Sequence, residues 1–315
     1  MARRKKGRPV NGILVLDKPA GITSNAALQK VKWLYQAQKA GHTGSLDPLA
    51  TGVLPVCLGE ATKVSHFLLD ADKRYRAKCV LGSVTTTGDS EGDVIATQAI
   101  PELNEEQLLQ LVFSFQGTQE QMPPMYSALK HNGRPLYEYA RKGIEVERKT
   151  RSITIFEIKL LDYSFASEQA FIEIEVHCSK GTYIRSLCED IGRKIGCGAY
   201  ISELRRLESG PFLLSQAITL DELNEKFGLY TDLDEADKSA MDQLLLPTDT
   251  AIESFPIVNL NERELDKIQH GHAISYRLPT DSRHENYRLY FNNLLIGLAV
   301  LNENGELKPK RLLFL

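Results

Sequence analysis

The sequence predicts an α+β fold rather than a doubly wound parallel sheet. Segments typical of strands and helices do not alternate regularly along the chain, which argues against repeated βα units. With 315 residues, of which 42% are hydrophobic, the chain fits one large domain plus a small one. From about residue 245 the pattern changes to short apolar runs, which indicates a small β-rich module at the C-terminal end.

The N-terminal part predicts strands and helices on both sides of a glycine-rich loop. An apolar run at residues 12–17 is typical of a buried strand, and residues 18–21 supply turn chemistry. N-cap candidates at residues 23–25 start a predicted helix that extends to about Lys39. The loop occupies residues 41–52. Beyond it the pattern predicts a strand at residues 53–58 and a helix at residues 59–69.

The middle of the chain supplies most of the predicted sheet, because its apolar and polar residues alternate as in half-buried strands. The predicted strands are residues 75–81, 153–161, 170–177, 200–207 and 212–215. The predicted helices are residues 105–115 and 183–195, and residues 86–92 are predicted to form a loop. The C-terminal module is predicted to contain strands at residues 256–258, 287–291 and 294–301.

The distribution of charge is more informative than the net charge of -3. A dedicated nucleic-acid-binding domain is often basic overall, so the total argues mildly against such a partner. Cations nevertheless cluster in the first eight residues and between residues 130 and 151, while acids gather at residues 232–237. Local basic patches are compatible with an RNA partner, although each patch alone is also typical of a solvated surface.

Other features exclude several classes of protein. No apolar run approaches the roughly 20 residues that cross a bilayer, and the N-terminus lacks the apolar core of a secretory signal. The five cysteines are odd in number, scattered and without a Cys-x-x-Cys pair. This pattern argues against a disulfide framework or a zinc site. We therefore expect a cytoplasmic protein without a metal.

The loop from Gly41 to Gly52 is the most distinctive segment of the sequence. Its glycines permit backbone conformations that are closed to other residues, and Asp47 followed by Pro48 places a carboxylate at a turn. An isolated Asp-Pro pair is usually only a turn starter. The surrounding residues therefore have to decide between a turn and an active site.

Those surroundings contain a series of motifs. The loop continues to Pro55 and into Leu58–Lys63. One further motif precedes the loop, at residues 11–21. The others come after it, at residues 72–75, 88–92, 124–130, 136–141, 178–185 and 204–206. Together they resemble the TruB family of tRNA pseudouridine synthases, over about residues 10–250, and the resemblance weakens beyond.

The resemblance implies a pseudouridine synthase fold, in which helices flank a mixed, largely antiparallel sheet. It implies a basic tail at residues 1–9, a catalytic domain at residues 10–250 and a small PUA-like RNA-binding β domain at residues 251–315. The implied reaction is the isomerisation of uridine 55 in the T loop of tRNAs, without a cofactor. The base is detached, rotated and rejoined through carbon, and it must first be flipped out of the folded RNA.

The resemblance also assigns roles to single residues. Asp47 matches the family's nucleophile, and Arg185 matches the arginine that pairs with it. A permanent cation suits a buried carboxylate that must stay ionised. Tyr75 matches a tyrosine that stacks on the flipped base, and its part in proton transfer stays open. His42 matches a histidine that fills the space vacated by that base.

Further matches concern the uracil pocket and the RNA. Tyr183 and Leu204 match residues that line the pocket. Asp89 matches an acid that bonds the base or holds the arginine and tyrosine, although its loop is also typical of a turn. The basic, tyrosine-bearing segment at residues 122–151 matches an RNA-gripping insertion, in which cations meet phosphates and aromatic rings stack on bases. The RNA contacts expected from it are Lys130, Arg141 and Lys142. We expect a monomer that binds the tRNA T stem-loop, without an obligate protein partner or a membrane.

Two alternatives stay open. An RNA chaperone that opens and refolds the tRNA elbow, with catalysis secondary, would use the same base-flipping apparatus. A guide-RNA-dependent synthase is the second, because the family has relatives in archaeal and eukaryotic modification complexes. A hydrolase fits poorly, since no Ser-His-Asp or metal constellation is evident.

Overall fold

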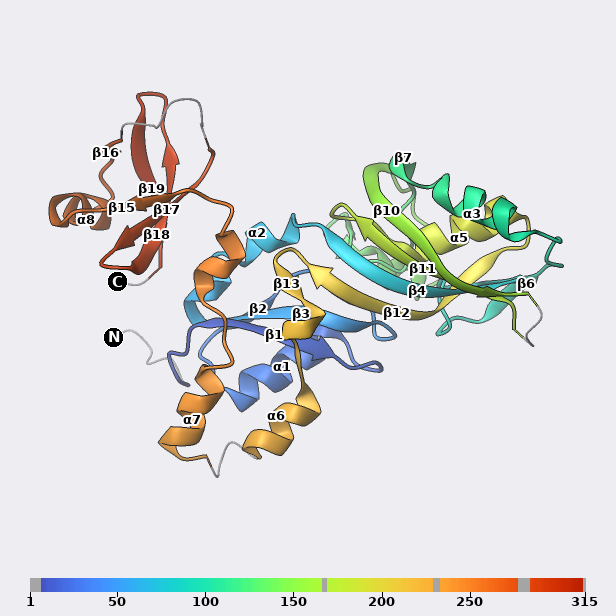
Figure 1. Cartoon of the computed structure of the whole chain (residues 1–315), viewed down its shortest axis with the longest axis horizontal. Coiled ribbons are helices and arrows are strands. Elements are labelled where there is room, and N and C mark those ends of the chain that lie inside the picture. The colour runs from blue at the N-terminus through green and yellow to red at the C-terminus, as the bar shows by residue number, and fades with distance from the viewer. Residues whose placement is uncertain (1–6, 166–168, 229–232, 277–283, 314–315) are drawn as a thin grey trace.

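The structure, a computed structural model, describes residues 7–165, 169–228, 233–276 and 284–313. A long mixed sheet carries helices, and a separate five-stranded sheet forms the C-terminal end (Figure 1). The predicted α+β class is therefore confirmed. The cations Arg3, Arg4, Lys5 and Lys6 of the predicted basic tail lie outside the described residues. No helix in the described ranges is long and apolar enough to cross a membrane.

The central sheet joins ten strands. Eight of them follow the order β14-β1-β3-β12-β4-β11-β10-β7, while β2 pairs with β3 and β13 pairs with β12. The β1–β14 and β3–β12 contacts are parallel. The bounds are β1 Gly12–Lys18, β2 Ala40–His42, β3 Thr51–Leu58, β4 Lys73–Leu81, β7 Gly117–Gln121, β10 Arg151–Ser164, β11 Phe171–Cys178, β12 Ala199–Ser209, β13 Phe212–Leu213 and β14 Ile218–Thr219.

The β3–β12 contact is a narrow seam between the two halves of this sheet. It consists of two residue pairs, Arg205 with Thr51 and Arg206 with Gly52, whereas β12 pairs with β4 along most of its length. Because β3 follows directly on the glycine-rich loop, the seam brings that loop against β12. The predicted active site therefore lies where the two halves of the sheet meet.

Each half of the sheet has its own hydrophobic cluster. Helices α1, α6 and α7 pack on β1 and β3, whereas α3 and α5 pack on β4, β10 and β11 (Figure 1). In α5 the apolar residues recur every three or four positions, which places them on one buried face. The bounds are α1 Ser24–Leu34, α3 Glu105–Phe113, α5 Ile184–Ile195, α6 Leu220–Phe227 and α7 Glu235–Asp242.

Several predicted bounds were wrong. The first helix ends at Leu34 instead of about Lys39, because Gln36 has a φ of 48°, a left-handed conformation through which an α-helix cannot continue. The helix predicted at residues 59–69 is divided into a 3-10 helix, η1 Gly59–Lys63, and α2 Ser65–Leu69. The strand predicted at residues 212–215 ends at Leu213, where a short 3-10 turn begins.

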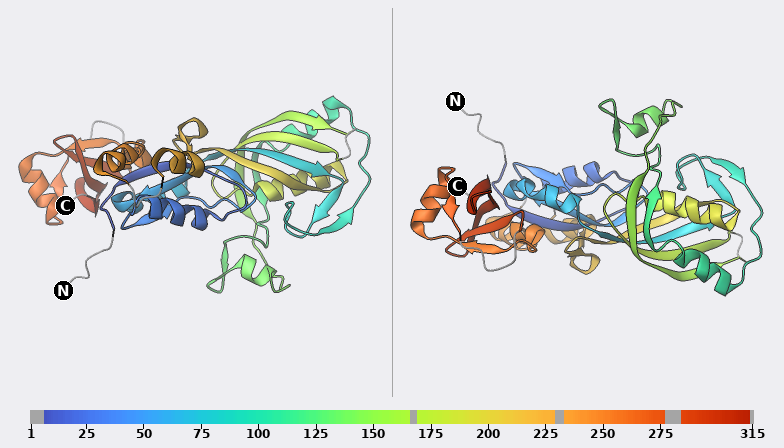
Figure 2. Two further views of the ribbon diagram at one scale, coloured as in Figure 1. Left: turned by 90° about the horizontal axis from the view of Figure 1, so that it is seen from below. Right: turned by 90° about the horizontal axis from the view of Figure 1, so that it is seen from above.

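Two excursions leave the body of the molecule. The hairpin of β5 Ser83–Thr85 and β6 Val94–Thr97 follows β4. The larger excursion joins β7 to β10 and contains β8 Lys130–His131, β9 Arg134–Pro135 and α4 Leu136–Ala140. Figure 2 shows this second segment, in light green, projecting away from the sheet. It corresponds in sequence to the expected RNA-gripping insertion.

The C-terminal sheet has the order β15-β17-β18-β19-β16 and one helix, α8. The bounds are β15 Ile257–Asn259, α8 Glu262–Gln269, β16 Ile274–Ser275, β17 Tyr287–Phe291, β18 Leu294–Leu301 and β19 Glu306–Leu312. An apolar cluster that includes Val64, Phe67, Ile252, Leu295 and Leu298 packs this module against η1 and α2. The exact domain boundary and the RNA-binding role of the module stay predictions.

Replacement of Gly52 by alanine should destabilise the fold more than replacement of Gly117. Both glycines have a positive φ, 101° and 112°, so both alanines incur backbone strain of roughly 1–3 kcal/mol. A Cβ at Gly52 would lie 2.1 Å from the carbonyl oxygen of Arg206, whereas a Cβ at Gly117 would meet nothing within 4 Å. The free energy of unfolding, measured by urea titration, should therefore fall by roughly 1–3 kcal/mol more for Gly52→Ala. Equal losses would show that the seam opens to admit a methyl group.

Candidate active site

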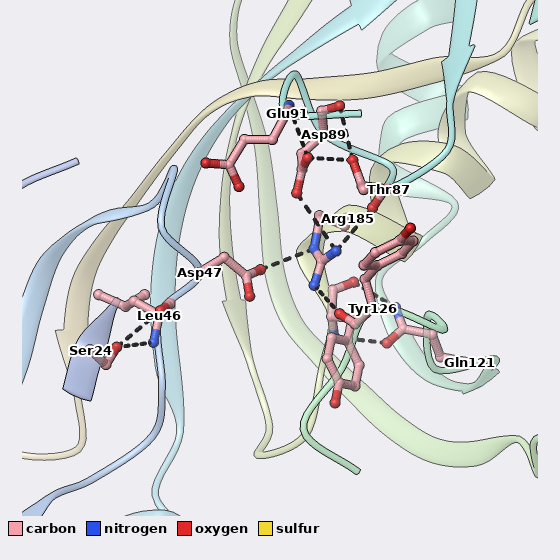
Figure 3. A network of polar contacts seen from close by, with 10 residues as sticks. Ser24, Leu46, Asp47, Thr87, Asp89, Glu91, Gln121, Tyr126 and Arg185 are labelled. Atoms are coloured by element: carbon pink, nitrogen blue, oxygen red, sulfur yellow. Dashed lines mark hydrogen bonds and ion pairs between the residues drawn. The ribbon is translucent and has the colours of Figure 1, made fainter. Parts of the chain in front are cut away.

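Asp47 lies in the loop between β2 and β3, and hydrogen bonds fix the residues on both sides of it. The Ser24 hydroxyl accepts from the Leu46 N–H at 2.7 Å and donates to the Leu46 carbonyl at 2.9 Å (Figure 3). The Gly21 N–H donates to the Pro48 carbonyl at 2.9 Å. The start of α1 and the turn before it therefore hold the carboxylate in place.

Lys18 also fixes this loop, although the sequence assigned it no separate role. Its side chain is fully buried, and its Nζ donates to the carbonyls of Pro19 and Ile22, both at 2.7 Å, and to that of Pro48 at 3.3 Å. Burial lowers the pKa of Lys18 to about 8, although the negative charge of Asp47 acts in the opposite direction and raises this pKa. Lys18 belongs to the motif at residues 11–21, but nothing in the sequence indicated that its side chain is buried.

Arg206 is the second cation that the sequence left without a role. It is fully buried, its Nε donates to the Val53 carbonyl at 2.7 Å, and its Nη2 donates to the Gly44 carbonyl at 3.0 Å. These acceptors lie on opposite sides of Asp47 in the chain, so one guanidinium fixes both ends of the loop. Arginine is rarely buried, which is why the pattern of residues 204–206 did not reveal this position.

Arg185 projects from the first turn of α5, and its side chain is only 6% exposed. Its Nε lies 3.0 Å from Oδ2 of Asp47. Its two terminal nitrogens donate to the carbonyls of Thr87 and Tyr126 at 2.9 and 2.7 Å, and Nη1 lies 3.6 Å from Oδ2 of Asp89 (Figure 3). Every nitrogen of the rigid guanidinium fork therefore has an acceptor, an arrangement that a lysine could not reproduce.

The pKa of Asp47 is raised above its usual value by burial. The nearby Arg185 opposes this shift, and the negative charge of Asp89 adds to it. The side chain keeps 41% of its surface exposed, so the carboxylate remains accessible from the cavities that it lines. The arginine thus favours an ionised carboxylate at a position where its surroundings would otherwise favour protonation.

Asp89 enters from the loop between β5 and β6 and is 3% exposed. Its Oδ1 accepts from the Thr87 hydroxyl at 2.5 Å and from the Glu91 N–H at 3.1 Å. These bonds leave Oδ2 directed at Arg185. The hairpin loop therefore contributes a second carboxylate to the arginine, together with the Thr87 carbonyl.

Two cavities adjoin at the ion pair, since Asp47 and Arg185 line both. The smaller has a volume of about 300 Å³ and is lined by Tyr75 from β4, Leu204 from β12 and Tyr183 from the start of α5. Its size and its aromatic and apolar walls suit a small planar ligand. Burial raises the pKa of Tyr75, so its phenol keeps its proton at neutral pH.

The larger cavity has a volume of about 500 Å³ and is lined by His42, Asp89, Glu91 and Arg141, among others. Burial lowers the pKa of His42, and the charge of Arg206 lowers it further, so the ring is neutral at pH 7. Within the described residues, His42 Nδ1 is a buried atom without a hydrogen-bond partner. The structure therefore brings His42 and Asp89 to the larger of the two cavities that Asp47 lines, and Tyr75, Tyr183 and Leu204 to the smaller.

Comparisons with known proteins identify the family. The "tRNA pseudouridine synthase B" of Vibrio atlanticus (strain LGP32) is 50% identical over 315 residues, which cover 99% of this chain and 97% of the relative. That of Vibrio parahaemolyticus serotype O3:K6 (strain RIMD 2210633) is 48% identical over 312 residues, covering 99% and 98%. The chain belongs to the TruB family. The resemblance inferred from the motifs is thereby confirmed.

Three TruB family models match successive parts of the chain. The TruB family pseudouridylate synthase (N terminal domain) matches residues 32–184. The tRNA pseudouridylate synthase B C-terminal domain matches residues 185–253, and the Pseudouridine synthase II TruB, C-terminal, matches residues 256–313. Asp47 and Arg185 fall in different matched regions, so the ion pair joins the two.

Solved structures confirm the predicted pseudouridine synthase fold. The structure described as "Crystal Structure of a Cbf5-Nop10-Gar1 Complex" aligns with a TM-score of 0.71 and 26% identity, covering 96% of this chain and 85% of that chain. A second, "Structure of H/ACA RNP bound to a substrate RNA containing 2'-deoxyuridine", aligns with a TM-score of 0.70 and 24% identity, covering 100% and 92%. At that identity the second likeness concerns the fold alone.

The three residues predicted to touch RNA lie on the insertion of this TruB protein. Lys130, Arg141 and Lys142 are all exposed. Arg141 lies 5.3 Å from the centroid of the Tyr137 ring and lines the larger cavity, whereas Lys130 and Lys142 line neither cavity. Their roles stay predictions.

All five cysteines are buried and free of disulfides. Among the residues that the structure describes, no group of three or more His, Cys, Asp or Glu side chains could hold a metal ion.

The substitution Asp47→Asn should not destabilise this TruB protein at neutral pH. Because the folded state raises the pKa of Asp47, the unfolded chain loses this proton first as the pH rises. Ionisation therefore costs stability, which falls from the unfolded pKa of about 3.9 through the higher folded pKa. The variant lacks this loss, so its Tm should equal or exceed that of the wild type at pH 7. Its advantage should shrink toward pH 4.

The substitution Asp162→Asn serves as the matched control for these Tm measurements, because Asp162 is an exposed aspartate on β10. If Asp47→Asn lowers the Tm at pH 7 and Asp162→Asn does not, the attraction of the Asp47 carboxylate to Arg185 exceeds the cost of burying its charge.

Proposed function

We propose that this chain isomerises uridine 55 in the T loop of tRNAs to pseudouridine, with Asp47 as nucleophile and no cofactor. The observation that carries the proposal is the Asp47–Arg185 ion pair at the junction of two cavities. The names of its relatives, which are tRNA pseudouridine synthases, supply the substrate.

The smaller cavity suits the flipped uracil. A planar base would lie between the aromatic and apolar walls formed by Tyr75, Tyr183 and Leu204, where stacking replaces the contacts that it loses in the RNA. His42, a neutral ring that lines the larger cavity, would occupy the space that the base leaves. Flipping therefore exchanges one set of ring contacts for another.

The chemistry follows from the state of the carboxylate. Arg185 favours the ionised form of Asp47, which a nucleophile requires. The carboxylate of Asp47 bonds to the ribose carbon as N1 of the base leaves it, the base rotates, and the bond to Asp47 breaks as C5 bonds to the same carbon. The hydrogen on C5 is released and N1 takes up a proton, so the product has the same composition as the substrate. Tyr75 carries its proton at neutral pH and lines the cavity proposed for the base, so we propose it as a group that exchanges protons with the base.

The insertion and the C-terminal module would hold the rest of the tRNA. Lys130, Arg141 and Lys142 are exposed cations suited to phosphates, and the Tyr137 ring beside Arg141 is suited to a base. We propose that a cytoplasmic monomer acts on bare tRNA. The complexes named in the Cbf5 structures contain further proteins, so turnover by the purified chain on transcript without guide RNA tests this part directly.

The substitution Asp47→Asn should abolish isomerisation. Loss of a nucleophile typically costs at least about 10⁴-fold in turnover. Tritium release from a tRNA transcript labelled at C5 of uracil measures the rate, and mapping of pseudouridine in the product identifies the nucleotide. Asp162→Asn should retain wild-type turnover. Near wild-type tritium release by Asp47→Asn would rule out Asp47 as the nucleophile.

The same variant separates catalysis from a tRNA-folding role. Refolding of a denatured tRNA, followed by its aminoacylation, requires binding and base flipping but not the nucleophile. If Asp47→Asn still speeds refolding, the chain has an additional chaperone function. If Asp47→Asn does not speed refolding, the residues that bind the tRNA and flip the base serve catalysis only.

The substitution Arg185→Lys should reduce turnover far more than tRNA affinity. A lysine cannot reach Asp47, Thr87 and Tyr126 together, and a misplacement of about 1 Å in an active site costs roughly 100-fold in rate. Affinity should change by less than about threefold, since most contacts with the RNA phosphates lie elsewhere.

The matched control is Arg193→Lys, which alters an exposed arginine two turns further along α5. Single-turnover rates and filter-binding constants give the two quantities. Equal losses of rate and affinity in Arg185→Lys would contradict the ion-pair account.

A further inference from the structure

Gln121 lies beside the active site without lining either cavity. It is the last residue of β7, its side chain is buried, and the insertion begins immediately after it. A buried primary amide needs partners for both its oxygen and its nitrogen. The partners of Gln121 show what it does.

Both partners belong to the backbone of one residue, Tyr183. The Tyr183 N–H donates to Oε1 of Gln121 at 2.8 Å, and Nε2 of Gln121 donates to the Tyr183 carbonyl at 3.0 Å. The side-chain amide thus pairs with the main chain as a neighbouring strand would. Only this orientation of the amide gives a donor to the carbonyl and an acceptor to the N–H.

Tyr183 is the N-cap residue of α5, and its own side chain makes no capping hydrogen bond. Its carbonyl also accepts from the Leu187 N–H at 3.1 Å, the first hydrogen bond of the helix. Gln121 therefore fixes the start of α5 from outside. Arg185 lies in the first turn that follows, so the position of its guanidinium depends on this anchor.

The next residues of the insertion reinforce the same turn. The Ser186 hydroxyl donates to the Met122 carbonyl at 3.1 Å, and Arg185 donates to the Tyr126 carbonyl at 2.7 Å. In Figure 3, Arg185 lies between Asp47 and the segment that carries Gln121 and Tyr126. The first residues of the insertion, from Met122 to Tyr126, are its root, and they form one side of the site that holds the Arg185 guanidinium.

We propose that Gln121 is a positioning residue, which aligns Tyr183 and Arg185 with Asp47 and ties that alignment to the root of the insertion. The inference deepens the proposed isomerisation and rests on it for its kinetic consequences. Gln121 acts on the base and on the carboxylate only through the backbone of α5.

The kinetic test compares Gln121→Leu with Gln119→Leu. Gln119 lies two positions earlier in β7, and its side chain donates to the Phe115 carbonyl at 2.6 Å, at the opposite end of α5 from Tyr183, where Lys194 contacts the Phe115 ring. Both variants lose one buried or half-buried amide of the same strand. Gln121→Leu should lower kcat by roughly 10- to 100-fold, as expected for a displaced catalytic group, with little change in KM. Gln119→Leu should keep both constants.

The pH profile supplies a readout that a purely structural role would not move. Arg185 lowers the pKa of Asp47, so a displaced arginine lets that pKa rise. The acid limb of kcat should move to higher pH in Gln121→Leu and stay in place in Gln119→Leu. Gln121→Glu keeps the acceptor for the Tyr183 N–H but loses the donor, so its kcat should lie between those of Gln121→Leu and the wild type. It also carries the test if the leucine variant does not fold.

A spectroscopic readout is independent of activity. With nitrogen-15-labelled arginine, the Nε–H signal of Arg185 is assigned by its absence in Arg185→Lys. It should be shifted or broadened in Gln121→Leu and unchanged in Gln119→Leu. If both leucine variants keep this signal and kcat, Gln121 has no positioning role. If the wild type releases no tritium from tRNA, the proposed function fails, while the Arg185 signal still decides the role of Gln121.

Discussion

The ion pair between Arg185 and Asp47 is the interaction on which the rest of the site depends. A nucleophilic carboxylate in a partly enclosed cavity needs a cation beside it to stay ionised, and Nε of Arg185 lies 3.0 Å away. The guanidinium is held by the β5–β6 loop and by the root of the insertion, while it is carried on α5. These segments are far apart in the sequence, so the pair forms only when both halves of the sheet are assembled. The geometry of the active site in this TruB protein therefore depends on the assembly of the whole sheet.

The loop that carries the carboxylate is held by two buried cations and by a glycine at a close backbone contact. Lys18 and Arg206 are buried cations that bond main-chain oxygens, and burying a charge costs free energy unless it is compensated. Gly52 leaves no room for a side chain against β12. Each of these features keeps the loop in one conformation, which is what a preorganised site requires. The local loss of stability is offset by the large apolar clusters on both sides of the seam.

Much of the fold could be predicted where local pattern and tertiary environment agree. In β11 every second residue is buried, and the apolar face of α5 recurs at the helical period, so both were predicted closely. The strand β7 was not predicted, because its polar residues Gly117–Gln121 form a strand only through pairing with β10. Short α6 and α7 were missed as well, although capping boxes at Thr219–Glu222 and Asp234–Asp237 mark their first turns. The end of α1 depends on Gln36, whose left-handed backbone no propensity indicates.

The sequence by itself determined the TruB family, the α+β class and the loop that carries Asp47, because these rest on residue identities close together in the chain. Only the tertiary structure decided which groups surround the carboxylate. The burial of Lys18 and Arg206 and the clasp of Gln121 on the start of α5 come from contacts across the sheet. Lysine, arginine and glutamine are usually exposed, so no local pattern marks the few that are buried. Only long-range packing excludes water from Lys18, Arg206 and Gln121. Because water is excluded, these side chains bond the backbone around Asp47 and at the start of α5.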